Sequence, residues 1–456
     1  MMIHRTSVLA AALAALTLAP DGTAQRFGRR GRPPEAAPQA APQPEKPAEP
    51  KKVESWTVIQ GGDVYVGDGT VLRRTHVVLA DAKIHAVGQE VEIPEGATIV
   101  DATGKVVAPG FCLPMASGFG APGGGSDVRE GLNPFDPTIK MGLAAGITSF
   151  LWTSGSGTGT PGGNSAVVKL AYGDLEGMVC VENTTVAMRV PLSAQDLSKF
   201  RDLVEQARKH QDAVKEAAGK PDAKPPAAPK GTEEILKVMS GEKRLWIAGG
   251  GGGFRFPGMG GGSGSRGFDQ TQIRQAMEIA TLLGVGVVLD RPIEAWAIAD
   301  EVAATGSMVV VSPRQRVESD EAAPETTGSN IAQSAILHAA GVPVAVTTPA
   351  GRFGGSPSIG TGGIMGQDLN TPHVDAAFAV RGGMPNRAAL RTLTLDSAKI
   401  ANAERRVGSI EAGKDADILI LDGDPLHYKT FVETALVNGK VVYRKDDEPY
   451  YRHIRR

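Results

Sequence analysis

The sequence predicts an α/β protein built on a TIM-like (β/α)8 barrel. Within residues 232–394, short apolar runs alternate with segments of helical period, which is the pattern of a parallel sheet covered by helices. Residues 56–91 and 407–443 lack a helical period and form short β-like runs separated by glycine turns. We therefore expect a barrel accompanied by smaller β units from the two ends of the chain.

The barrel elements follow one another at the spacing that βα units need. A strand that ends at Pro109-Gly110 turns into a second buried strand at 111–115. Two insertions interrupt the later alternation: residues 193–230, a polar helix followed by a Pro/Ala/Lys linker, and the glycine run 249–267. The remaining expected elements are strands at 245–248, 285–290, 308–312 and 342–347 and helices at 232–238, 270–283, 293–304, 330–340 and 387–394.

The first residues predict export. A short basic start, an apolar run at 8–18 and the small residues Gly22-Thr23-Ala24 are typical of a signal peptide over residues 1–24. The apolar run is too short to span a membrane. Residues 25–54 are rich in Pro, Ala, Glu and Lys, which predicts a disordered linker. We therefore expect a secreted or periplasmic protein whose fold starts at residue 55.

The composition fits a globular chain without nucleic-acid partners. With 456 residues and 41% hydrophobic content, the chain can bury a sizeable core. The formal net charge of -2 gives no basic footprint for nucleic acid. Cys112 and Cys180 lie in apolar runs, so two separate buried thiols are favoured, and a disulfide stays open in an oxidising compartment. The glycine runs lack a nucleotide-binding fingerprint and are interpreted as loops.

Two motifs resemble the amidohydrolase superfamily, in its imidazolonepropionase-like branch. Residues 101–111 follow its barrel-entry signature, Asp-x-x-Gly-x-x-x-x-Pro-Gly-Phe. Residues 408–417, Gly-Ser-Ile-Glu-Ala-Gly-Lys-Asp-Ala-Asp, are similar to a run in the β-sandwich that flanks the family's barrel. The resemblance implies a small β-sandwich assembled from residues 55–108 and 401–445, a barrel at 109–400, and a tail at 446–456.

The same resemblance implies that metal ligands have been lost. Active members hold zinc or another divalent metal at the carboxyl ends of the barrel strands, where the metal lowers the pKa of bound water. At the two histidine positions of the signature this chain has Met115 and Ser117, and Leu113 replaces its aspartate. Arg291 stands at a later histidine position, and Pro349 at the position of the proton-transferring aspartate.

The other positions where ligands are expected also lack donors. No His or Glu occurs at 189–192, and the strand at 244–248 runs directly into the glycine run. Lys169 lies in a segment similar to a Gly-Gly-Gln-x-Ala-x-x-Lys-Leu segment of the family. A loop position is favoured for it, and the role of a metal-bridging carboxylated lysine stays open. Of the eight histidines, His373 alone is expected near the barrel mouth.

We therefore expect a catalytically degenerate, secreted relative of hydrolases that cleave non-peptide, cyclic-amide carbon–nitrogen bonds. It would bind a small molecule or serve a structural role, and no catalytic residue, metal or cofactor is assigned. Two alternatives stay open: an active hydrolase that uses Asp290, His373 or Arg255, and a metal-free protein that binds a small anion. The family suggests a homo-oligomer. The vestigial pocket is expected to contain Met115, Ser117, Asp290, Arg291, Thr347, Thr348, Pro349 and Arg352.

Overall fold

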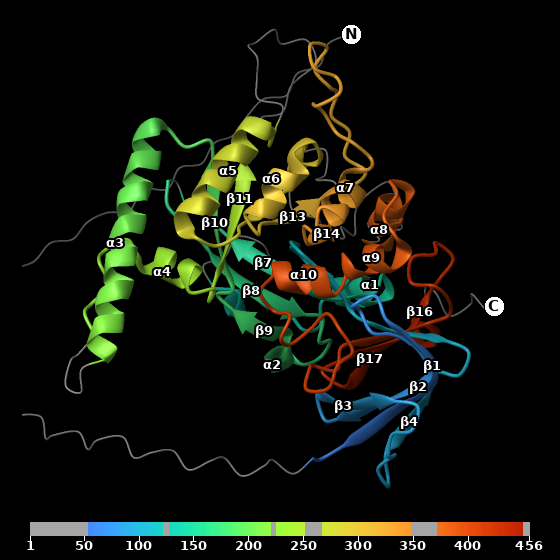
Figure 1. Cartoon of the computed structure of the whole chain (residues 1–456). Coiled ribbons are helices and arrows are strands. Elements are labelled where there is room, and N and C mark those ends of the chain that lie inside the picture. The colour runs from blue at the N-terminus through green and yellow to red at the C-terminus, as the bar shows by residue number, and fades with distance from the viewer. Residues whose placement is uncertain are drawn as a thin grey trace, which may run out of the picture. The chain divides into compact units, whose positions relative to one another are not determined.

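The computed structural model describes residues 53–121, 127–157, 159–219, 225–250, 267–348 and 372–449. In this part of the chain the strands form three sheets, with helices packed beside them (Figure 1). The α/β class that the sequence predicts is confirmed. The expected signal peptide, most of the linker, most of the glycine run and the end of the tail lie outside the described residues.

The two ends of the chain form one sheet of eight strands. Its order is β17-β16-β15-β5-β1-β2-β3, and β4 pairs with β1. The ends meet in an antiparallel pair of β5 and β15, in which Val107 lies opposite Ile420. The N-terminal and C-terminal segments therefore assemble together, as expected. They form one hydrogen-bonded sheet, whereas the sequence predicts the two halves of a sandwich. The strands are β1 (Trp56–Tyr65), β2 (Val71–Ala80), β3 (Lys83–Gly88), β4 (Thr98–Asp101), β5 (Val106–Pro109), β15 (Ile418–Leu421), β16 (Val432–Val437) and β17 (Lys440–Arg444).

A parallel sheet of five strands carries most of the helices. Its order, β10-β11-β12-β13-β14, follows the chain, and one or more helices join each strand to the next. Both faces of such a sheet are buried, which explains the short, continuous apolar strands. The strands are β10 (Thr185–Val190), β11 (Arg244–Gly249), β12 (Val288–Asp290), β13 (Met308–Val311) and β14 (Val344–Val346), and the helices are α3 (Ala194–Ala218), α4 (Glu233–Met239), α5 (Gln270–Leu283), η2 (Ala295–Ile298), α6 (Ala299–Ala304) and α7 (Gln333–Ala339).

A third sheet, β6-β7-β8-β9, precedes the parallel sheet in the chain. β6 and β7 are parallel, whereas β8 and β9 are added antiparallel. One segment touches both sheets, because Leu393 O accepts a hydrogen bond from Cys112 N in β6 (2.7 Å) and Thr392 O accepts one from Val346 N in β14 (3.4 Å). The remaining elements are β6 (Phe111–Leu113), β7 (Ile147–Ser154), β8 (Asn164–Lys169), β9 (Val179–Glu182), η1 (Arg129–Gly131), α1 (Pro137–Ala144), α2 (Leu175–Met178), α8 (Pro372–Arg381), α9 (Asn386–Arg391), α10 (Leu395–Ile400) and η4 (Lys445–Asp447).

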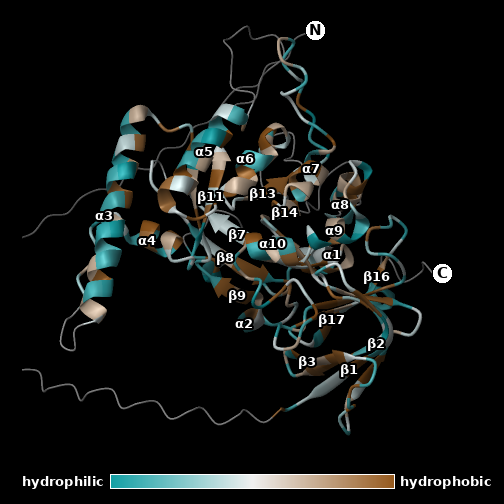
Figure 2. Ribbon diagram, in the orientation of Figure 1, coloured by the Kyte–Doolittle hydropathy of each residue, from teal (hydrophilic) through white to brown (hydrophobic). Residues whose placement is uncertain are grey.

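Side chains of the parallel strands alternate between two apolar clusters. Leu245 and Ile247 of β11 pack in a cluster with side chains of α3, α4, α5 and α7. Trp246, between them, belongs to a second cluster that also contains Val288 and Val310 of the neighbouring strands. This alternation follows from the two-residue period of a strand, so each strand has a helix-facing and an inner side. Figure 2 shows the strands as mainly hydrophobic and the outer helix α3 as mainly hydrophilic.

The helix positions show how local sequence sets element boundaries. The helix expected at 270–283 is confirmed as α5: the Asp269 side chain caps it by accepting a hydrogen bond from Gln272 N (3.0 Å), and Gly284 ends it at φ 73°. The long polar helix expected from residue 193 is confirmed as α3. The helix expected from residue 293 starts later, as a 3-10 turn at Ala295.

Both cysteines are free and buried, as the sequence favours. Burial is the main influence on them, and it raises the pKa of Cys112 to about 12 and that of Cys180 to about 11. Such thiols stay protonated at neutral pH, so neither is a nucleophile. Among the helices that the structure describes, none is both long and apolar enough to cross a membrane.

Candidate functional site

A cavity of about 560 Å³ lies at the carboxyl ends of the parallel strands. Residues at or near the carboxyl ends of β7, β10, β11 and β12 line it, together with residues that follow β6 and β13. Ligands in α/β folds bind at this edge of the strands, where variable loops follow a rigid scaffold. The polar side chains among the lining residues are Thr153, Ser156, Arg189, Asp290, Arg291 and Gln315.

Arg189, Ala248 and Asp290 form one row across β10, β11 and β12. Arg189 is paired with Ala248, and Ala248 with Asp290. The row lies two residues beyond Trp246, which faces the inner cluster, so strand alternation turns all three side chains toward that same inner side. All three line the cavity. The small side chain of Ala248 therefore separates a cation from a carboxylate on the cavity floor.

Asp290 and Arg291 form a bidentate ion pair at the cavity. Arg291 Nε donates to Asp290 Oδ1 and an Arg291 terminal nitrogen donates to Asp290 Oδ2, each at 3.0 Å. Asp290 is 8% exposed, and the Arg291 side chain is 27% exposed. Burial alone would lower the pKa of Arg291, but Asp290 outweighs burial and raises that pKa, so the arginine is charged. Arg291 also has φ 53°, a left-handed conformation that is uncommon outside glycine and clusters at binding sites.

The structure brings part of the expected vestigial pocket together. Met115, Asp290 and Arg291 line the cavity, whereas the other described members do not. Thr347 and Thr348 follow β14 and are buried at 4% and 7% exposure, and the described residues provide no hydrogen-bond partner for Thr347 Oγ1. Ser117 is half-buried. Pro349, Arg352 and Arg255 lie outside the described residues, so the vestigial role of the set stays a prediction.

His373 does not line the cavity. It lies in the first turn of α8 and is half-buried. Burial lowers the pKa of His373 to about 4, so its imidazole is neutral at physiological pH. Two residues later, Asp375 is fully buried and holds Arg314 through a bidentate pair at 2.7 and 3.1 Å. This part of α8 is thus tied to the segment after β13 rather than directed into the cavity.

The described residues do not fit the divalent metal that the family uses. Within the described ranges, no three His, Cys, Asp or Glu side chains are grouped so that they would hold an ion. Among the described residues that line the cavity, Asp290 is the single acidic one, and none is a His or Cys. Both of its oxygens already accept hydrogen bonds from Arg291, whose fixed charge opposes a nearby cation.

Lys169 is neither a loop residue nor a metal-bridging lysine, the two interpretations that the sequence allows. The expectation of a loop position is wrong, since Lys169 ends β8 and is completely buried. It also lies far along the strand from the cavity: Lys169 pairs with Ser149, near the amino end of β7, whereas Thr153 of β7 lines the cavity. A metal-bridging role at the cavity is therefore excluded for this lysine.

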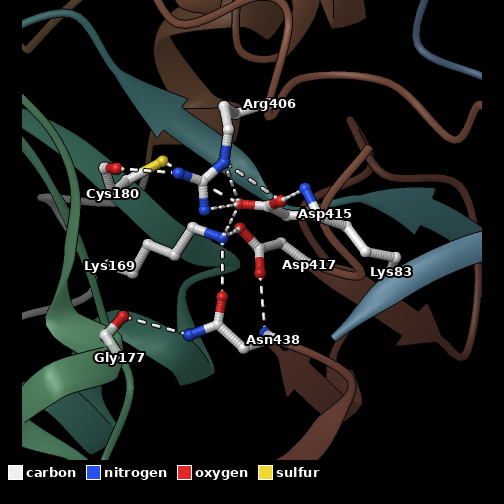
Figure 3. A network of polar contacts seen from close by, with 8 residues as sticks. All are labelled: Lys83, Lys169, Gly177, Cys180, Arg406, Asp415, Asp417 and Asn438. Carbon is white, nitrogen blue, oxygen red and sulfur yellow. Dashed lines mark hydrogen bonds and ion pairs between the residues drawn. The ribbon is translucent and has the colours of Figure 1, made fainter. Parts of the chain in front are cut away.

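The partners of Lys169 come from the C-terminal segment (Figure 3). Its Nζ lies 2.6 Å from Asp415 Oδ2, 2.9 Å from Asp417 Oδ2 and 2.7 Å from Asn438 Oδ1. The contact with Asp417 is an ion pair without hydrogen-bond geometry, since Asp417 Oδ2 has no hydrogen-bond partner. Because Lys169 would be costly to bury alone, the two aspartates are needed to offset the loss of its hydration.

Asp415 forms ion pairs with three cationic side chains in this network. It pairs with Lys169, with Lys83 of β3 and, through two nitrogens, with Arg406. Burial would raise the pKa of Asp415, but Arg406, Lys169 and Lys83 together lower it to about 2. The network thus joins β8, β3 and the C-terminal segment, and its role is structural. The Asp-x-Asp spacing at 415 and 417 puts both carboxylates on one side of an extended segment. This spacing is the one feature of the sequence that indicates a paired carboxylate site for Lys169.

Comparisons with known proteins agree with the motifs. Residues 301–443 match the model of the amidohydrolase family. The fold is similar to that of an amidohydrolase from Thermotoga maritima MSB8, with a TM-score of 0.62, 23% identity, and coverage of 85% of this chain and 100% of that chain. A structure of molinate hydrolase gives a TM-score of 0.46 and 16% identity over 85% of this chain and 94% of that chain, too low to carry an argument. No curated protein matches the sequence.

Proposed function

We propose that this chain, which resembles the amidohydrolases in its fold and in residues 301–443, binds a small organic anion and has lost the family's metal site. The observation that carries the proposal is the cavity at the strand ends. Two arginines, Arg189 and Arg291, line it where the family's metal ligands are expected, and Asp290 is the one acidic residue of the described lining.

The proposal includes a single TIM-like barrel. In this arrangement β6–β9 and β10–β14 are two sectors of one closed sheet. Residues 392 and 393 support closure on one side, because they accept hydrogen bonds from both β6 and β14. On the other side, Gly157 and Gly162 form isolated bridges to Met188 and Ala187 of β10. The cavity would then occupy the mouth of the barrel, where TIM-barrel proteins bind their ligands.

The charges of the cavity favour an anion. Asp290 neutralises one positive charge at most, so the two arginines leave a net positive charge among the described lining residues. Arg189 is exposed and forms no ion pair with any described residue. Hydrogen bonds from a guanidinium to a carboxylate contribute about 1.5–3 kcal/mol each, more than bonds between neutral groups. A carboxylate ligand would therefore find better partners here than a neutral one.

The same residues argue against hydrolysis. Cleavage of an amide needs a group that takes a proton from water within hydrogen-bond reach of the reacting atoms. Asp290 is the one carboxylate in the described lining, and Arg291 holds both of its oxygens. Because both oxygens already accept hydrogen bonds from Arg291, this carboxylate serves to hold the guanidinium in place. The arrangement therefore suits binding and orientation better than proton transfer.

We predict that small carboxylates raise the melting temperature of the full chain without being consumed. A ligand that binds the native state alone stabilises it by mass action, about 2.7 kcal/mol at a hundredfold excess over Kd. Arg291→Ala should remove this stabilisation, whereas Arg201→Ala, which removes a surface arginine on α3, should retain it. The measurement is a thermal shift series combined with chromatography of the ligand. Equal stabilisation of wild type and Arg291→Ala would contradict the pocket assignment.

A further inference from the structure

We infer that the cavity takes a small dicarboxylate, held at one end by Arg189 and at the other by Arg291, with Ala248 forming the floor between them. This inference rests on the proposed anion-binding function. It specifies the ligand as a dicarboxylate and assigns one carboxylate of the ligand to each arginine. Asp290 is the residue that positions Arg291.

The spacing of the two arginines supports a two-point site. Arg189 and Asp290 each pair with Ala248 on opposite sides, so their Cα atoms are two interstrand spacings apart, about 10 Å. Arg291 follows Asp290 directly. All of these residues line the same cavity of about 560 Å³, which is in the range of sites for small molecules. Two cations separated by a methyl-sized floor can contact opposite ends of one short ligand.

Asp290 leaves one edge of Arg291 available. A guanidinium has five N–H donors in a planar fork with two edges that can each take a carboxylate. Asp290 occupies the edge formed by Nε and one terminal nitrogen, and among the described residues no other side chain forms a hydrogen bond or ion pair with Arg291. The second edge, at the two terminal nitrogens, keeps its donors. A buried carboxylate on one edge therefore fixes the plane of the guanidinium and presents the other edge.

Arg189 differs from Arg291 in having no counterion among the described residues. Its side chain is exposed, and it forms no ion pair within the described part of the chain. Neighbouring side chains in its row are those of Ala248 and Asp290, and Asp290 is engaged by Arg291. An anion bound at Arg189 would therefore compete with no carboxylate of the described residues. The two arginines form unequal half-sites, because Arg291 is held by Asp290 and Arg189 is not held by an ion pair with any described residue.

The test uses isothermal titration of the full chain with succinate, glutarate and monomethyl succinate. The monoester keeps the length of succinate but removes one negative charge, so it measures the second contact directly. We expect at least one dicarboxylate to bind about tenfold or more tightly than the monoester, as one extra charge-assisted hydrogen bond would give. Arg189→Gln and Arg291→Lys should each reduce dicarboxylate affinity by about tenfold and abolish the preference over the monoester.

The outcomes test the two-point dicarboxylate site and the anion-binding function separately. Arg201→Ala should leave both affinities unchanged, because Arg201 pairs with Glu278 on the outer helices. If wild type binds the monoester as tightly as the diacids, the two-point inference is overturned and the anion-binding function stands. If none of the three ligands binds, the proposed function fails with it. Loss of the preference in only one of the two arginine variants would overturn the assignment of the other arginine.

Discussion

Replacing Lys169 with Met is expected to lower the free energy of unfolding by about 3–5 kcal/mol, the usual cost of removing one partner from a buried ion pair. The side chain of Lys169 is 1% exposed and that of Asp417 is 4% exposed. Without the lysine, Asp417 is left as a buried carboxylate with no ion-pair partner among the described residues, while Asp415 keeps Arg406 and Lys83. Urea unfolding of the full chain, followed by circular dichroism, measures the change.

Lys199→Met provides the matched control for this substitution. Lys199 is 63% exposed and lies 3.8 Å from Asp196 on the surface of α3. Exposed pairs of this kind contribute about 0–1 kcal/mol, so its loss should be close to neutral. If Lys169→Met changed the unfolding free energy no more than Lys199→Met, the network around Asp415 would not stabilise the fold as described.

The second large effect is a loss of stability in acid that depends on Asp415. Burial opposes ionisation of Asp415, but Arg406, Lys169 and Lys83 hold its pKa at about 2, below the ordinary value of 3.8. A carboxyl whose pKa is lower in the folded state contributes stability that is complete above the unfolded value. That contribution declines as pH falls from about 4 toward 2, where the folded protein must also take up the proton.

Urea midpoints measured from pH 6 to pH 2 test this assignment. Wild type should lose stability through the acid range, whereas Asp415→Asn, less stable at neutral pH, should show a shallower decline because it lacks this carboxyl. The difference between the two proteins should therefore narrow as pH falls. A difference that stays constant from pH 6 to pH 2 would show that Asp415 has the same pKa in the folded and unfolded states.

The sequence predicts much of the fold because local signals and period agree. The period of α5 and its cap at Asp269 define that helix, and the two-residue alternation of β11 defines a strand. The eight-stranded sheet needed more than local pattern, since β5 and β15 are distant in the chain, and the resemblance of residues 408–417 supplied that link. At the late start of the helix after Ile293, the Glu294 side chain accepts hydrogen bonds from Gln270 N and Gly328 N, which are tertiary contacts that periodicity does not contain.

The site is predictable in part for a similar reason. Met115, Asp290 and Arg291 were found because the motif registers place them at strand ends. Arg189 lies where a metal ligand is expected, but arginine is not a metal ligand, so the motif does not mark it as a site residue. Its meaning depends on pairing through Ala248 with Asp290, which sequence does not show. The partners of Lys169 were missed because Asp415 is 246 residues away and no local period connects them.

The most direct test of the central claim is the metal content of the full chain, measured by elemental analysis after incubation with zinc and removal of unbound ion. We expect far less than one zinc per chain and no hydrolysis of cyclic amides or dipeptides above the rate without protein. One tightly held zinc per chain, together with hydrolysis that a chelator abolishes, would contradict the loss of the metal site. The protein would then be a metal-dependent hydrolase.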